Sequence, residues 1–267
     1  MNIYGRVGWR AASNAPTIDD AQAFITAAGI TDSTQQSAIT TLVSQLKGYG
    51  IWTKMKAIYP FVGGTASSHK FNLKDPRDLD AAFRLVFNGG WTHSSTGAKP
   101  NGTTAYANTK FNPQSSLTLN SEHLSYYSRT TSNGTEVEIG AESGVPYSLI
   151  EIRTAGTTYT QIQGGGYLTY SDSDSKGLYV ANRNASTNQN MWKDGVKLAT
   201  GTGTPPGLVN QNIYIGAFNN PTYAPFINYY STKESAFASI GDGLTDTEAA
   251  NFYTAVQAYQ TTLGRQV

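Results

Sequence analysis

The feature that most constrains this chain is a series of short alternating segments that recurs between residues 116 and 241. Apolar and polar residues alternate within the segments, and Gly, Asn, Pro or Ser separates them, as in antiparallel sandwiches. Asp194-Gly195 is a strong hairpin signal, because a type I′ turn needs positive φ at both central residues. We therefore predict two packed antiparallel sheets. The predicted strands cover residues 83–87, 116–120, 123–129, 135–140, 147–153, 157–163, 166–171, 177–183, 188–193, 196–200, 212–218 and 235–241.

Helical patterns stand on both sides of these strands. Apolar stripes with capping residues predict helices over 17–28 and 33–47, followed by a short helical piece at 52–58. A last helix is predicted over 245–264, where a Thr and a Glu three positions later form a capping box. The predicted fold class is all-β, an antiparallel sandwich with N-terminal helices and a C-terminal helix.

Composition narrows the function classes. The chain has no cysteine, 14% charged residues and a net charge of +1. The lack of cysteine excludes a disulfide scaffold and a thiolate site, and the low charge argues against nucleic acid or an acidic membrane as a partner. No secretion signal follows residue 1, and no window reaches the roughly 18 apolar residues of a membrane span. We therefore expect neither nucleic acid nor a membrane as a partner.

Three runs near the end of the chain carry a resemblance to a known family. MWKDGVKLA (191–199), NIYIGAFN (212–219) and FASIGDGLTDTEAANFYTAVQAYQ (237–260) are similar to the closing signature of concanavalin A-like and laminin-G-like domains. Runs between 46 and 130, among them GYGIWTKMKAIYPFVGG and NGGWTHSSTGAKPNGTTAYANTKFNP, resemble a region found with such domains in structural proteins of tailed bacteriophages. The resemblance implies a jelly-roll sandwich and a place on a virion.

We divide the chain accordingly into three parts. Residues 1–16 form an N-terminal arm, residues 17–82 form a helical region packed on the sandwich, and residues 83–267 form the concanavalin A-like sandwich with its C-terminal helix. Such sandwiches serve as lectins, hydrolases and structural modules, so the fold does not decide the function.

The stretch TEVEIGAE, residues 135–142, decides whether we expect an enzyme. The hydrolases that share this fold carry three acids on one strand, and the last acid comes two or three positions after the middle one. With Glu138 as the middle acid, these positions are Gly140 and Ala141, so the last acid is missing. In a regular strand Glu136 and Glu138 would share one face, and a solvated outer face explains both acids without chemistry. We therefore expect no enzymatic activity, with a laminarinase-type glycoside hydrolase as the remote alternative.

Other candidate sites are few. The three histidines show no metal-ligand spacing and are predicted to be structural; they are His69, His93 and His123. Asp172 and Asp174 lie in an Asp-x-Asp-x-x-Gly pattern typical of calcium loops, but the closing Glu is missing. We expect a solvated turn and no cofactor, with a calcium ion at these two acids as the alternative. Aromatic rings beside amide groups are typical of glycan sites, although aromatic residues in β-proteins mostly fill cores. The candidates for glycan contact are Trp91, His93, Tyr106, Asn219 and Tyr223.

The balance of these features favours a bacteriophage virion surface protein, made in the host cytoplasm. A capsid decoration protein, a head fibre or a tail accessory protein fits, with other virion proteins as partners and a homo-oligomer in the particle. The aromatic and basic arm is predicted to anchor it, through Tyr4, Arg6, Trp9 and Arg10. The alternative is a carbohydrate-binding protein, a lectin or receptor-binding module that holds host or mucosal glycans.

Overall fold

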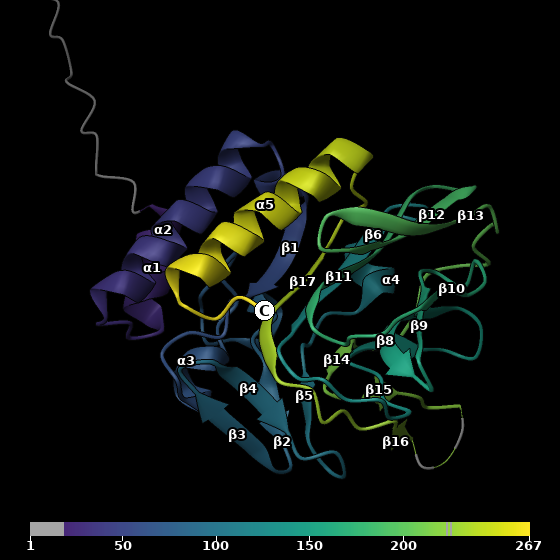
Figure 1. The fold of residues 1–267 in the computed structure, drawn as a ribbon, viewed down its shortest axis with the longest axis horizontal. Coiled ribbons are helices and arrows are strands. Elements are labelled where there is room, and N and C mark those ends of the chain that lie inside the picture. Colours follow the sequence, from purple (N-terminus) through teal and green to yellow (C-terminus); the bar gives the residue numbers. More distant parts are fainter. Residues whose placement is uncertain (1–18, 223, 225) are drawn as a thin grey trace, which may run out of the picture.

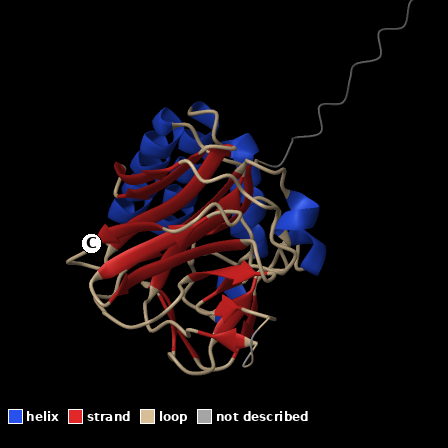
Figure 2. Ribbon diagram, turned by 90° about the vertical axis from the view of Figure 1, so that its right-hand side faces the viewer, coloured by secondary structure: helices blue, strands red, loops and turns tan. Residues whose placement is uncertain are grey.

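The computed structural model describes residues 19–222, 224 and 226–267. The two predicted sheets are present and pack face to face, with every strand pairing antiparallel except one parallel contact between Asn219 and Ala141. Figures 1 and 2 show that the three longest helices lie along one side of this sandwich. The predicted fold class is therefore confirmed.

The first sheet carries the helices and is called the helix-covered sheet. It has eight strands. Their order is β13 (Val196–Gly201), β12 (Asn188–Lys193), β11 (Gly177–Ala185), β6 (Glu122–Ser128), β17 (Ser235–Gly241), β4 (Gly97–Pro100) and β3 (Trp91–Ser94), with β1 (Met55–Tyr59) also paired to β17.

The second sheet is called the open sheet, and it has nine strands. Their order is β10 (Leu168–Ser171), β9 (Thr157–Gln161), β8 (Tyr147–Thr154), β7 (Ile139–Glu142), β14 (Tyr214–Ile215), β5 (Tyr106–Asn108) and β2 (Val86–Asn88), while β15 (Phe218–Asn219) pairs with β7 and β16 (Ile227–Asn228).

The main core lies between the two sheets, where side chains that alternate along the strands point inward. Leu124 and Tyr126 of β6 meet Ile139 of β7 and Ile150 of β8 in this layer, and all four are fully buried. The neighbouring positions on β7 and β8 point the other way, toward the outer face of the open sheet.

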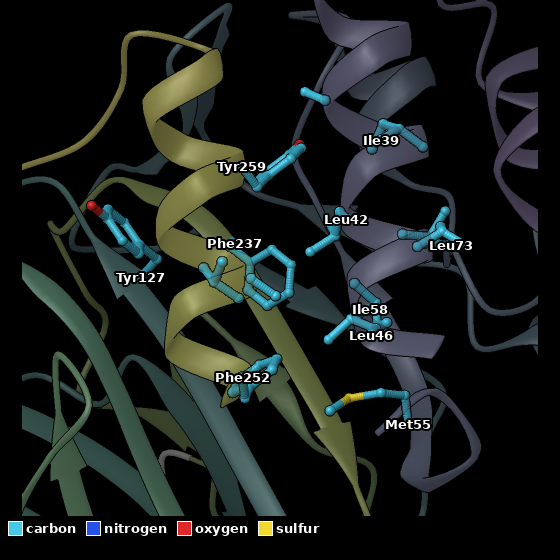
Figure 3. Packing of buried hydrophobic residues seen from close by; sticks show 14 of the residues in the cluster. Ile39, Leu42, Leu46, Met55, Ile58, Leu73, Tyr127, Phe237, Phe252 and Tyr259 are labelled. Atoms are coloured by element: carbon cyan, nitrogen blue, oxygen red, sulfur yellow. The ribbon is translucent and has the colours of Figure 1, made fainter. Parts of the chain in front are cut away.

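A second core joins the helix-covered sheet to α1 (Asp20–Ala27), α2 (Ser33–Gly48) and α5 (Asp246–Thr262). Figure 3 shows Phe237 of β17 packed against Phe252 and Tyr259 of α5, with Leu42 of α2 facing them. The predicted capping box of α5 is present, since Thr245 and Glu248 each bond the other's backbone amide. Because these helices cover the face, its residues are removed from solvent.

The remaining helical pieces are short. They are α3 (Ala66–His69), α4 (Pro113–Ser116) and two 3-10 turns, η1 (Trp52–Lys54) and η2 (Asp80–Ala82). No helix among the described residues is long and apolar enough to cross a membrane.

Several local predictions are wrong. The helical piece predicted at 52–58 is η1 followed by β1, because Met55 to Tyr59 pair with β17 and so extend the sheet. The strand predicted at 116–120 is instead the end of α4 and a loop with one isolated bridge. The hairpin at Asp194-Gly195 is as predicted, with φ of 49° and 77° at the two residues.

Candidate functional site

The outer face of the open sheet is the one to which no described helix contributes core residues. The small apolar cluster on it consists of strand and loop residues alone, Val137, Leu149, Phe218 and Tyr147. Helices α1, α2 and α5 lie on the opposite side of the molecule, against the other sheet (Figure 1). We call this surface the open face.

Five aromatic rings form a continuous series on the open face, which we call the aromatic row. Consecutive ring centroids lie between 6.2 and 6.4 Å apart, and two rings of the row, Tyr147 and Phe218, are stacked with an interplanar angle of 8°. The exposed members are Tyr167, with 52% of its surface accessible, and Tyr229, with 46%. In order, the row runs Tyr159, Tyr167, Tyr147, Phe218 and Tyr229.

Register places Tyr147 and Tyr159 on one side of the sheet together with two carboxyl groups, and the ring contacts join the rest of the row to them. Residues directly opposite on paired strands point to the same face. Glu142 is opposite Tyr147, and Glu151 is opposite Tyr159. Burial raises the pKa of the Tyr167 hydroxyl to about 12, and the nearby charge of Glu151 adds to the increase.

Hydrogen-bond acceptors on the open face lack donors. Within the described residues, neither carboxylate oxygen of the buried Glu142 has a hydrogen-bond partner. The side-chain oxygen of Gln161, which shares this face because it is opposite Leu149, also has none. Buried polar atoms are normally paired, so these two side chains are exceptions within the described residues.

The structure brings some of the predicted glycan residues to this face. Tyr106 stacks on Tyr214 at 4.8 Å, and the register of Tyr214 with Gly140 places that pair on the open face. Asn219 is not on this face, because it follows the outward-facing Phe218 in β15 and is opposite Ala141 of the inter-sheet core; its side-chain amide donates to the carbonyl of Asn212. Tyr223, like Tyr4, Arg6, Trp9 and Arg10 of the arm, lies outside the described residues.

Trp91 and His93 lie elsewhere, in an aromatic cluster at the edge of the sandwich. His93 packs against Phe87 at 4.6 Å and is stacked with Trp91 at 6.2 Å. Its Nδ1 lies 2.9 Å from Nδ1 of His69, so two histidines that are distant in sequence are in contact. Burial, with a smaller effect of the nearby His93, lowers the pKa of His69 to about 3.

The third histidine is a satisfied structural residue, as predicted. The Nδ1 atom of His123 lies 2.7 Å from the carbonyl oxygen of Asp242, and its Nε2 atom lies 3.1 Å from Ser239 Oγ. No group of three or more His, Asp or Glu side chains in the described part of the chain is placed to hold a metal.

The prediction for Glu136 and Glu138 is wrong. Neither side chain is on a solvated face: Glu138 is fully buried, and only 7% of the surface of Glu136 is accessible. Both bind the ammonium group of Lys233, which is itself fully buried, at 3.0 Å from Glu136 Oε2 and 3.1 Å from Glu138 Oε1. The sequence does not mark Lys233, because it lies 95 positions from Glu138 in an ordinary polar run.

The two carboxyl groups of this triad differ in their proton affinity. Burial raises the pKa of Glu138 to about 7, although Lys233 and the amide of Ile152 oppose the increase. Burial acts in the same direction on Glu136, but hydrogen bonds from Thr232 and the charge of Lys233 outweigh it and lower the pKa. The triad therefore holds one carboxylate beside one carboxyl group that is easily protonated.

The possible calcium loop is occupied by protein groups. Asp172 accepts from Lys193 at 2.8 Å, from Tyr179 at 2.6 Å and from Thr158 at 3.1 Å. Asp174 caps the same turn through its own backbone and side chain. Asp172 is buried, which corrects the expected solvated turn, and a calcium ion would have to displace the Lys193 ammonium group.

A polar cavity of about 700 Å³ opens at one end of the sandwich, between α4 and the start of α5. Its charges are already paired, since Lys54 binds Glu248 and Lys56 binds Asp242. The side chains that line it include no aromatic ring. The cavity therefore offers hydroxyl and amide groups without the flat apolar surface of the aromatic row.

Comparison with known proteins adds to the description of the fold. No known family and no curated protein matches the sequence. Among solved structures, a mutant of Trypanosoma rangeli sialidase that displays trans-sialidase activity matches with a TM-score of 0.52 and 11% identity over 84% of this chain. The match spans 39% of the sialidase chain.

Two further matches are weaker in TM-score. Domain 4 of a GH43 extracellular arabinanase from Geobacillus stearothermophilus, solved with arabinotriose, gives a TM-score of 0.46 with 13% identity over 74% of this chain and 98% of that chain. The binding domain of botulinum neurotoxin serotype G gives 0.46 with 9% identity over 76% of this chain and 51% of that chain. At these identities the likeness concerns the fold alone, and the chain is a jelly-roll β-sandwich.

Proposed function

We propose that this chain is a carbohydrate-binding module and that the open face holds the glycan. The observation that carries the proposal is the aromatic row on an uncovered sheet face. Flat rings stack on the apolar faces of sugars, and the partly exposed Glu151, which lies opposite Tyr159 on the same face, offers an acceptor for sugar hydroxyls. The polar cavity at the end of the sandwich is the less suitable surface, because its lining lacks such rings.

The proposed activity is binding without cleavage. A retaining hydrolase places two carboxyl groups on either side of the sugar bond. Glu136 and Glu138 are buried and bound to Lys233, so a sugar would have to displace that ammonium group to reach them. Release of reducing ends from a bound polysaccharide would contradict this part of the proposal.

The charge of the open face indicates a class of glycan. Two carboxyl groups, those of Glu142 and Glu151, lie beside the aromatic row. Carboxylates repel sulfated and sialylated sugars and attract cationic groups. We therefore propose neutral sugars or sugars with a free amino group as the ligands.

A glycan array with matched variants tests the proposal. Tyr167→Ala removes the most exposed ring of the row and is expected to weaken binding about tenfold, which corresponds to about 1.4 kcal/mol. Tyr170→Ala is the control, because Tyr170 is also exposed but is opposite Thr158, so its side chain leaves β10 on the other face. Equal loss in both variants, or no glycan bound by the wild type, would refute the proposal.

The virion setting is a further part of the proposal, and its support is the sequence resemblance. A glycan-binding sandwich on a particle surface would bring phage and glycan-coated host or mucus together. The protein is then expected to copurify with intact particles, and deletion of residues 1–12 is expected to abolish incorporation while the sandwich stays folded. Incorporation of the truncated chain at the normal copy number would refute the anchoring role of the arm.

A further inference from the structure

The Glu136, Glu138 and Lys233 triad is placed to form a covalent bond, and the proposed glycan binding does not use it. We propose that the Lys233 amine condenses with the Glu138 carboxyl group to form an intramolecular amide cross-link. The geometry carries this inference: Lys233 Nζ lies 3.1 Å from Glu138 Oε1 in a site where both side chains are fully buried.

The triad joins the two sheets. Lys233 lies two residues before β17 of the helix-covered sheet, and Glu138 lies directly before β7 of the open sheet. The backbone holds both partners, since the Glu138 amide donates to the Ile150 carbonyl and the Tyr126 hydroxyl donates to the Lys233 carbonyl. Fixed neighbours in a dry site have a high effective concentration, which favours condensation over a bimolecular reaction in water.

The hydrogen bonds assign different roles to the two acids. Glu136 accepts from the Thr232 amide at 2.9 Å and from the Thr232 hydroxyl at 2.7 Å, and these bonds stabilise its carboxylate form. Glu136 is therefore the ionised proton acceptor of the triad. Burial acts to lower the pKa of Lys233, but the neighbouring Glu138 and Glu136 outweigh it and raise that pKa, so the loss of the Lys233 proton to Glu136 is an uphill step. Glu138 accepts a single backbone bond at Oε2, from the Ile152 amide at 2.6 Å, and burial favours its neutral form. Glu138 is therefore the electrophile.

The reaction balances without an added reagent. The Glu136 carboxylate takes one proton from the Lys233 ammonium group, and the free amine attacks Cδ of the protonated Glu138. The developing negative charge on Oε2 is stabilised by the Ile152 amide, in the manner of an oxyanion hole. The new C–N bond remains when the Oε1 hydroxyl takes the second amine proton and leaves as water, and Glu136 keeps the first proton.

The structural alternative is a permanent buried ion pair. Such pairs are costly, because two carboxyls and one ammonium group lose their hydration. Condensation removes the charges of Lys233 and Glu136, because Glu136 keeps the proton that Lys233 loses, and it leaves an amide that needs only ordinary hydrogen bonds. The cross-link would close a loop of the chain between residues 138 and 233, so the two segments could not be pulled apart at this point without breaking a covalent bond.

Intact mass spectrometry of the purified full chain, unfolded in acid, tests the proposal. The wild type is expected to be lighter than its sequence by the mass of one water molecule. Proteolysis is expected to give a branched peptide that joins Glu138 to Lys233. A wild-type mass that equals the sequence mass would overturn the proposal, and a branch at Glu136 would overturn the assigned roles.

Two variants separate the chemistry from folding. Lys233→Arg keeps the positive charge but is a poor nucleophile because the guanidinium stays protonated, so its mass is expected to equal its sequence mass. Glu136→Gln removes the base and is expected to accumulate uncondensed chains, while circular dichroism reports whether either variant folds. The wild-type mass decides the question even if both variants fail to fold. Complete condensation in the folded Glu136→Gln variant would overturn the role of Glu136.

Discussion

The two outer sheet faces of this sandwich use aromatic residues for different purposes. On the helix-covered sheet, Phe237 is fully buried against Phe252 and Tyr259 of α5 (Figure 3). On the open sheet, Tyr147 and Tyr167 form a row whose rings contact one another and partly face solvent. The same residue class therefore stabilises the fold on one face and, in our proposal, holds a ligand on the other.

The comparison shows that the role of an outward-pointing strand residue depends on whether a helix covers that face of the sheet. Apolar residues surround the rings under α5, whereas Glu142, Glu151 and Gln161 share the open face with the row. Acids and amides beside aromatic rings are unfavourable for packing a helix and favourable for binding a polar ligand. Variants on the two faces should therefore separate stability from binding.

The largest effect is expected from Phe237→Ala on the covered face. Truncation leaves a cavity beneath α5 and is expected to lower the free energy of unfolding by about 3 to 5 kcal/mol. Chemical denaturation measures this loss, and glycan affinity should be unchanged wherever the variant is folded. A loss below about 1 kcal/mol, or weaker binding by the folded variant, would break the contrast between the faces.

A fall in pH is expected to lower the free energy of unfolding through His123, which lies on the helix-covered sheet. Burial lowers its pKa from 6.5 to about 4 in the folded protein, so the unfolded chain binds more protons between these values. The contribution of neutral His123 to the free energy of unfolding is complete above pH 6.5. It is lost as the pH falls through about 4, and the total loss is about 3 kcal/mol.

His123→Gln is the matched variant for this acid effect. Its unfolding free energy, measured between pH 7 and pH 4, is expected to fall less steeply than that of the wild type. Parallel curves for the two proteins would show that His123 is not the group responsible.

On the open face, Glu151→Gln tests the role of charge. If the ligand carries an amino group, removal of the carboxylate is expected to weaken binding about tenfold, or about 1.4 kcal/mol, and salt should weaken the wild type in the same way. A neutral glycan of the same size is the control and should lose little. Stronger binding of anionic glycans by the wild type than by the variant would contradict the assigned charge preference.

The smallest effect is expected from Tyr167→Phe. The ring remains and the hydroxyl is lost, so binding should fall by about threefold or less, well below the effect of Tyr167→Ala. Titration of both variants with one glycan measures the ratio. If the Phe variant bound the glycan as weakly as the Ala variant, the hydroxyl and not the ring would be the group that binds the glycan.

Much of the fold could be predicted from local pattern. The alternation in SAFASIG predicts residues 235–241, the bounds that β17 has, and the capping box places α5 within a residue or two. The piece at 52–58 could not be predicted in this way, because its apolar residues suit a helix equally well. Pairing with β17, far along the chain, decides that Met55 to Tyr59 form a strand.

The candidate site was less accessible to sequence reasoning. Alternation already places Tyr147, Leu149 and Glu151 on one side of a strand, but it does not say which side the helices cover. The burial of Glu136 and Glu138 depends on Lys233, and nothing near either acid in sequence indicates that partner. Long-range pairing is the information that the local pattern lacks.

The most direct test of the open-face site is an NMR titration of protein labelled in its tyrosine rings and backbone amides, using a glycan identified on the array. Resonances of Tyr147, Tyr159 and Tyr167 are expected to shift with ligand, while those of Tyr127 beneath α5 and Tyr259 of α5 stay fixed. Shifts confined to backbone amides around the polar cavity, such as Asn184, with the row unchanged, would contradict the account.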